Sequence, residues 1–245
     1  MVTAGLFDAP NGQQSLGSAS CPSPTVLLGG GAVVLASSLA ANINSSWPQS
    51  DTQWSVWVNN NSGLDTSFYV YAICANQPKD YAVVQSATTD NAPNTTSEVY
   101  QACTKPAKPL GGGVYSTSAE LDTNLAASAP GYTTAKPKTY GWIGMEANNT
   151  GADFSMVTYV ICGKVKGYVV TGTAADNPSG TETGLSAACP SPKVPLGGGP
   201  FSNNFEDTVT VNSTYPFTGN AWTSYVNNAS PDDNEAFDYA VCGGT

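Results

Sequence analysis

The chain has 245 residues, with 18 aspartate or glutamate residues against 8 basic ones, so its formal net charge is -10. All 8 basic residues are lysines and histidine is absent, which excludes Ser-His-Asp catalysis, histidine-ligated zinc and arginine recognition of phosphate. We therefore expect no nucleic-acid or other anionic partner. Hydrophobic residues make up 40% of the chain, enough for a sizeable core, and they form no run long enough to insert into a membrane.

Three copies of one unit follow each other along the chain. Each copy opens with a cysteine that precedes a Leu-Gly-Gly-Gly string, and it closes with a tryptophan followed by a second cysteine. The opening cysteines are Cys21, Cys103 and Cys189, the tryptophans are Trp54, Trp142 and Trp222, and the closing cysteines are Cys74, Cys162 and Cys242. This spacing predicts units at 1–80, 81–166 and 167–245 in one compact body, the first unit truncated or capped at its N-terminus.

Within a unit, in chain order, we predict a strand before the opening cysteine and a strand around the Leu-Gly-Gly-Gly string. A strand ending near Pro48, Pro130 or Pro216 follows, and a hairpin closes the unit. Helix signals are almost absent because Gly, Pro, Asn, Ser and Thr interrupt every long segment. The predicted class is all-β, with four or five strands per unit and a pseudo-threefold, β-prism-like arrangement. Three tandem small disulfide-stapled β-sandwiches are the alternative.

The six cysteines most simply bridge within each unit, although other pairings are formally possible. The expected bridges join Cys21 to Cys74, Cys103 to Cys162 and Cys189 to Cys242. Because neither a Cys-x-x-Cys pair nor histidine is present, we interpret them as structural disulfides, which predict a secreted or surface-displayed protein. The chain starts without a basic leader, so we expect a secretion signal either to have been removed or not to exist.

Two resemblances concern the whole chain. The Cys-Pro-Ser-Pro string, the Leu-Gly-Gly-Gly string and the closing Trp, Asn-Asn and Tyr-x-x-Cys segment resemble repeats in secreted bacterial proteins, mostly of unassigned function. In architecture the chain is also similar to the vitelline-membrane outer-layer proteins, disulfide-containing β-prisms of three repeats that open with Cys-Pro. The rest of their motif does not match, so this likeness implies a fold and assigns no functional residue.

Aromatic side chains can stack on a sugar without any charge. We interpret the repeated tryptophans, together with Tyr71, Tyr159 and Tyr239, as core residues, because aromatics held at one register are usually buried. The residue before the repeated proline is Trp47, Ala129 or Tyr215. Since a position that accepts alanine is rarely a core anchor, we predict that Trp47 and Tyr215 are exposed stacking platforms, together with Trp57.

Each closing hairpin places an asparagine five residues before an aspartate. The pairs are Asn60 with Asp65, Asn148 with Asp153, and Asn228 with Asp233. Such groups can bind sugar hydroxyls, and Asp232, Asp233 and Glu235 form a local cluster that could ligate calcium. The alternative is that they satisfy the turn backbone and need no ligand. Asn-x-Ser/Thr sequons begin at Asn44, Asn60, Asn94, Asn148, Asn212 and Asn228.

The glycine triplets lack the Lys-Ser/Thr of a phosphate loop, so we predict that they allow close packing, a bulge or a positive φ at the centre of the fold. Catalysis would have to use carboxylate pairs of the glycosidase kind, such as Glu120 with Asp122 or Glu206 with Asp207. Neighbouring acids in loops are usually solvated, so we expect no enzymatic activity.

The leading hypothesis is a secreted, non-enzymatic, lectin-like protein that binds a neutral glycan through loop aromatics and Asn/Asp, with no cofactor other than an optional calcium ion. The alternative is a self-assembling extracellular structural protein, such as a coat, appendage or filament subunit. In that hypothesis an unpaired segment 1–20 would complete a sheet of the next copy. A receptor-binding adhesin differs from the lectin mainly in its partner.

Overall fold

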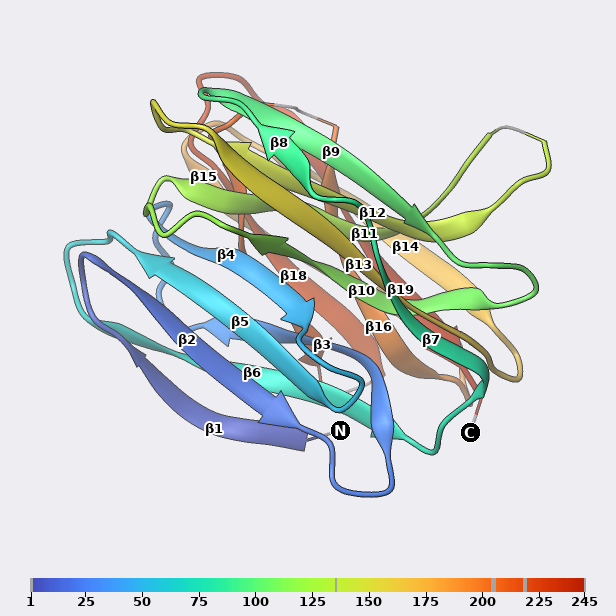
Figure 1. The fold of residues 1–245 in the computed structure, drawn as a ribbon. Helices are drawn as coiled ribbons and strands as arrows, with labels where there is room; N and C mark the ends of the chain where they lie inside the picture. Colours follow the sequence, from blue (N-terminus) through green and yellow to red (C-terminus); the bar gives the residue numbers. More distant parts are fainter. Residues whose placement is uncertain (1, 135, 204–205, 218–219, 245) are drawn as a thin grey trace.

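The computed structural model describes residues 2–134, 136–203, 206–217 and 220–244. Every regular element in these ranges is a β-strand, so the predicted all-β class is confirmed. No helix that could span a membrane occurs among the described residues. The strands run lengthwise through the molecule, and most connections gather at its two ends (Figure 1).

The strands fall into three consecutive sets, which we call units 1, 2 and 3. Unit 1 contains β1 (Val2–Ala9), β2 (Gln13–Ser20), β3 (Val26–Val34), β4 (Ala41–Pro48), β5 (Gln53–Asn60) and β6 (Thr66–Ala75). Unit 2 contains β7 (Lys79–Gln85), β8 (Thr89–Asn91), β9 (Thr95–Ala102), β10 (Lys108–Ser116), β11 (Thr123–Tyr132), β12 (Tyr140–Asn148) and β13 (Phe154–Lys164). Unit 3 contains β14 (Val169–Asn177), β15 (Thr181–Ala188), β16 (Val194–Ser202), β17 (Val209–Phe217), β18 (Ala221–Asn228) and β19 (Asn234–Gly243).

The same antiparallel pairings occur in each unit. In unit 1, β6 pairs with β1 and β3, while β5 pairs with β2 and β4. Units 2 and 3 pair their corresponding strands in the same way. Each unit therefore has more strands than the four or five predicted. The least conspicuous are β2 and β15, which are rich in Ser, Gly and Ala and contain few β-branched or aromatic residues, although buried residues alternate with more exposed ones in their second halves.

Segment 1–20 corrects the expectation of a truncated first unit. Its β1 pairs with β6, with Phe7 opposite Phe68, and its β2 pairs with β5. Both strands of this segment are thus used inside the same chain. The hypothesis that an unpaired segment 1–20 adds to a neighbouring copy loses its structural basis.

Two sheets cross the boundaries between units. β3 pairs with β17 of unit 3, and β4 pairs with β10 of unit 2. The resulting strand orders are β1-β6-β3-β17-β18-β15 and β2-β5-β4-β10-β13-β7. Three separate sandwiches would not share sheets in this way. At the third boundary β11 lies beside β16, in separate three-stranded sheets of the described chain.

The glycine triplets explain how the units approach so closely. A Cβ on the third glycine would overlap a carbonyl oxygen of the neighbouring unit, as for Gly113 against Ser46. A Cβ on the middle glycine would overlap the buried tryptophan ring, as for Gly112 against Trp142. The strand register also shifts at the leucine before each triplet. The predicted close packing and bulge are therefore both present.

Three disulfides close the units with the predicted pairing. They join Cys21 to Cys74, Cys103 to Cys162 and Cys189 to Cys242. All of them lie toward the same end of the molecule, which we call the disulfide end, because the opening cysteines follow β2, β9 and β15 and the closing ones lie near the ends of β6, β13 and β19. Such bonds indicate folding in an oxidising compartment.

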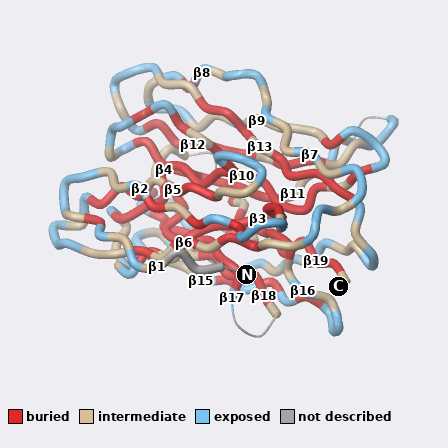
Figure 2. Tube along the Cα trace, turned by 60° about the horizontal axis from the view of Figure 1, so that its bottom comes forward, coloured by how far each residue is buried: buried red, intermediate tan, exposed pale blue. Residues whose placement is uncertain are grey.

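The core lies between the two strand groups of each unit. Figure 2 shows buried segments running through the strands and exposed segments in most of the connections. Trp54, Trp142 and Trp222 are fully buried there, which confirms their predicted core role. Each indole Nε1 donates a hydrogen bond to a hydroxyl, at 3.0 Å to Ser46, 2.9 Å to Ser128 and 2.8 Å to Thr214. The polar edge of each ring is thereby satisfied inside the core.

Candidate functional site

The two aromatic residues predicted to be exposed platforms are buried instead. Trp47 is 8% exposed and packs on Tyr115, with ring centroids 5.0 Å apart. Tyr215 is 9% exposed and stacks on Tyr71 at 5.7 Å. They fill the boundaries between units, so their role is structural, and Trp57 is half-buried on β5.

The repeated asparagines are buried as well. Asn60 Nδ2 donates to the carbonyl oxygens of Ala9 at 2.7 Å and Leu64 at 2.8 Å, and its Oδ1 accepts from the Ser62 backbone and hydroxyl. Asn148 and Asn228 make the equivalent bonds in their own hairpins. All the hydrogen-bonding groups of these amides are occupied, so the predicted sugar-binding role is wrong and the turn-stabilising alternative holds.

The repeated aspartates are exposed but do not form a site. Asp65 accepts a hydrogen bond from the Asn11 backbone, and Asp233 accepts one from the Ser179 backbone, both at 2.9 Å. Asp153 lies exposed in the matching turn. In the described part of the chain no three acidic side chains converge for a metal ion, so the calcium cluster expected at Asp232, Asp233 and Glu235 is not formed.

A hollow of about 840 Å³ opens at the boundary between units 2 and 3. We call it the tyrosine hollow. Its lining includes Tyr132, Tyr140, Tyr168, Tyr239, Phe201, Ala129, Lys108 and Lys138. These residues come from β10, β11, β12, β16, β19 and the connections beside them, so no short segment of sequence contains the site. Tyr132 is 56% exposed at its rim.

The hollow exists because Ala129 is small. Ala129 occupies the position of Trp47 and Tyr215 before the repeated proline. At the other two boundaries this position holds an aromatic ring that packs on a neighbouring ring, whereas here Ala129 lines the hollow together with Tyr239 and Phe201. The alanine that suggested an exposed position is thus itself buried and lines the hollow.

Lysines lie directly over the tyrosine rings. Lys108 Nζ is 3.1 Å from the centroid of the Tyr140 ring, and Lys138 Nζ is 3.3 Å from that of Tyr132. These are cation–π contacts. Burial raises the pKa of the Tyr168 phenol, so the group stays protonated at neutral pH, and its hydroxyl has no hydrogen-bond partner among the described residues. The hollow thus offers aromatic rings and ammonium groups, while the Tyr168 hydroxyl is buried beneath its surface.

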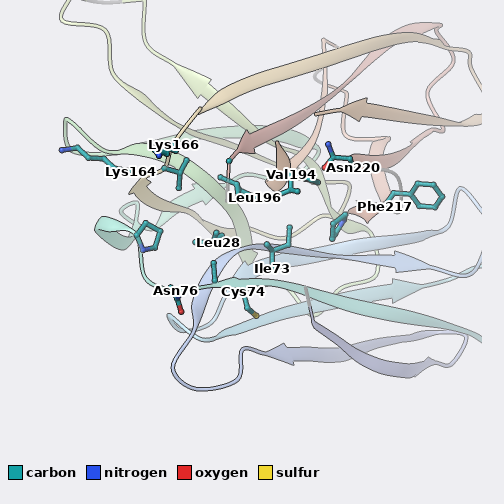
Figure 3. A pocket seen from close by; sticks show the side chains of 16 residues that line it. Leu28, Ile73, Cys74, Asn76, Lys164, Lys166, Val194, Leu196, Phe217 and Asn220 are labelled. Carbon is teal, nitrogen blue, oxygen red and sulfur yellow. The ribbon is translucent and has the colours of Figure 1, made fainter. Parts of the chain in front are cut away.

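A second hollow of about 760 Å³ lies at the same end of the molecule (Figure 3). We call it the leucine hollow, because Leu28 and Leu196 line it together with Ile73 and Val194. Lys164 and Lys166 stand on one side of it in the close-up view. The connection between β13 and β14 separates it from the tyrosine hollow, since residues 164–166 line one and residues 168–170 line the other.

Charges are strongly segregated between the two ends. Every lysine of the chain lies at a strand end or in a connection at the disulfide end: Lys79, Lys105, Lys108, Lys136, Lys138, Lys164, Lys166 and Lys193. Asp51 and Asp80 are the aspartates in connections or strand ends there. The opposite end and the strand residues near it carry Asp8, Asp65, Asp90, Glu120, Asp122, Asp153, Asp176, Glu182, Glu206, Asp207, Asp232, Asp233 and Glu235. A net charge of -10 therefore conceals a basic end.

Two buried acids were not singled out by the sequence. Glu146 accepts a hydrogen bond from Ser116 Oγ at 2.9 Å, and Asp238 accepts one from Ser224 Oγ at 2.7 Å. Burial raises the pKa of Glu146 to about 7 and that of Asp238 to about 8. Both residues lie between the strand groups and line neither hollow, so we assign them to the core.

Comparisons with known proteins add no functional assignment. No protein-family model matches this chain, and a search of curated proteins finds no match. The tyrosine hollow, defined by its own geometry, is therefore the candidate site.

Proposed function

We propose that this chain is a secreted, non-enzymatic carbohydrate-binding protein whose ligand site is the tyrosine hollow. The carrying observation is the cluster of tyrosine faces left open by Ala129. A sugar ring places its apolar face on an aromatic ring and its hydroxyls toward polar groups, and the ammonium groups of Lys108 and Lys138 in the lining supply such groups. The proposal keeps the lectin-like function expected from the sequence but moves the site from the hairpin loops to the hollow.

Secretion and a pseudo-threefold, β-prism-like arrangement belong to the same proposal. Three disulfides support an oxidising compartment. The first glycines support the symmetry, because their contacts form a cycle. A Cβ on Gly29 would meet unit 3 at Leu196, one on Gly111 would meet unit 1 at Leu28, and one on Gly197 would meet unit 2 at Leu110.

The test is a glycan array with purified, disulfide-intact protein and the variant Ala129→Trp. Tryptophan already occupies the matching position in unit 1, so it should fill the hollow without breaking the fold. We expect binding to fall at least tenfold. Tyr132→Ala, at the exposed rim, removes one ring face with less risk to folding. Leu64→Ala is the control, since Leu64 is 76% exposed in a turn at the opposite end.

Light scattering on the same samples separates the alternatives. Glycan binding by a monodisperse protein that both hollow variants lose supports the proposal. Binding that survives Ala129→Trp in a folded protein removes the hollow as the site. An array without any hit, together with large regular particles, would favour the self-assembling structural protein instead.

A further inference from the structure

The lysines of the disulfide end have few acidic partners. In the described ranges, one ion pair occurs at this end, between Lys164 and Asp80 at 2.8 Å. Lys108 and Lys138 lie on tyrosine rings instead of carboxylates. Like charges gathered around a concave surface raise the local concentration of oppositely charged ligands. This end therefore attracts anions even though the whole chain is acidic.

The position of the ammonium groups also constrains the ligand. A neutral sugar that stacked on the lysine-covered face of Tyr140 or Tyr132 would have to displace the lysine and would offer its ammonium group only uncharged hydroxyl acceptors. A sugar that carries a carboxylate or sulfate can take the ring face and pair with the displaced ammonium group. The geometry thus favours an acidic ring over a neutral one.

We propose that the ligand of the tyrosine hollow is an acidic polysaccharide, which runs from this hollow across the β13–β14 connection toward the leucine hollow. This inference rests on the proposed carbohydrate-binding function. The two hollows are adjacent, and each has two lysines in its lining. Two adjacent apolar hollows that both have lysines at their sides suit a polymer of charged sugars. The absence of arginine, the residue that binds phosphate through two parallel hydrogen bonds, disfavours a nucleic acid.

The experiment measures calorimetric affinity of the full chain for three acidic polymers: polygalacturonate, alginate and chondroitin sulfate. Methyl-esterified polygalacturonate is the matched neutral polymer, and phosphatidylserine vesicles test a lipid surface. We expect the acidic polymer to bind at least tenfold more tightly than its ester, with affinity that falls as salt is raised. The double variant Lys108→Gln, Lys138→Gln should weaken acidic-polymer binding at least tenfold and reduce the salt dependence.

A charge-matched control uses the opposite end. Asn61→Asp with Asn149→Asp, both exposed there, makes the net charge more negative by the same two units and should leave affinity unchanged. Equal affinity for the acidic polymer and its ester overturns the inference while the carbohydrate-binding function stands. Binding to none of the three acidic polymers, or to the vesicles alone, overturns the inference too, and neutral hits on the glycan array then decide the proposed function separately.

Discussion

Two boundaries between units are joined by asparagine and serine, and the third is lined by alanine. Between units 1 and 2, Asn59 Nδ2 donates to the Thr123 carbonyl at 2.9 Å, and Ser45 Oγ accepts from the Ser116 backbone at 2.9 Å. Between units 3 and 1, Asn227 donates to the Ser38 carbonyl at 3.0 Å and Ser213 accepts from the Val34 backbone at 2.9 Å. Between units 2 and 3 the matching positions are Ala126, Ala127 and Ala147, packed with Met145.

The boundaries therefore differ in how completely they are filled. At the asparagine boundaries, amides satisfy backbone carbonyls of the neighbouring unit, the sheets are continuous and an aromatic ring fills the gap. At the alanine boundary the strands pack without sheet pairing in the described residues, and Ala129 leaves the hollow open. Two boundaries are thus closed by hydrogen bonds and aromatic rings, and the third contains the hollow that we propose as the ligand site.

The largest effect on stability is expected from Gly113→Ala. Its Cβ would overlap the Ser46 carbonyl oxygen across the boundary of units 1 and 2, and a backbone atom within a sheet cannot easily move. We expect a loss of about 3 kcal/mol or more in the free energy of unfolding, measured by urea denaturation. Gly151→Ala, where a Cβ meets nothing within 4 Å, is the control. Equal stability of the two variants would contradict the close approach of the units.

A smaller effect is expected from Asn59→Ala. The change removes the amide donor of the Glu120 carbonyl and one of the two amide donors of the Thr123 carbonyl, which also accepts from Asn44, and this should cost about 1 to 3 kcal/mol in unfolding free energy. Exposed Asn149→Ala is the control and should be nearly neutral. The reverse change, Ala147→Asn, should not stabilise the alanine boundary, because its neighbours there are apolar. A gain in stability from Ala147→Asn would show that the boundaries are interchangeable.

The pH dependence of the free energy of unfolding tests a further difference between the units. Units 2 and 3, which flank the alanine boundary, contain Glu146 and Asp238, whereas unit 1 has Val58 and Val70 at the matching positions. Between the ordinary pKa near 4 and the raised value, the folded state holds more protons than the unfolded state. The free energy of unfolding should therefore fall as pH rises from about 4 to about 8, by at most about 1.4 kcal/mol per pH unit for each group.

Urea denaturation at pH 5 and pH 8 measures this slope. Asp238→Asn should flatten it, while exposed Asp153→Asn should leave it unchanged. Stability that rises over this range in the unmodified protein would refute the assignment of neutral, buried carboxyls.

The sequence predicted the buried tryptophans, the close packing at the glycines and the strand class correctly, whereas Tyr71, Tyr159 and Tyr239, also interpreted as core residues, are only half-buried. The correctly predicted features depend on residues whose surroundings recur in every unit. Each of the three repeats therefore supports the same prediction. The prediction of sugar-binding residues in the hairpins was wrong for the opposite reason. Asn60 and its equivalents look like ligand groups, but only their contacts show that the turn backbone uses them completely. Segment 1–20 was misread because its strands carry weak local signals and are stabilised by β5 and β6.

The all-β class and the disulfide pairing could be predicted from the sequence, because strand propensity and cysteine spacing are properties of a single unit. Only the tertiary structure decided where the rings and charges meet. The lysines are scattered over the chain from residue 79 to residue 193, and antiparallel pairing brings them to one end. The tyrosine hollow depends on Ala129 lying opposite Tyr239 of another unit, a relation that sequence distance does not reveal.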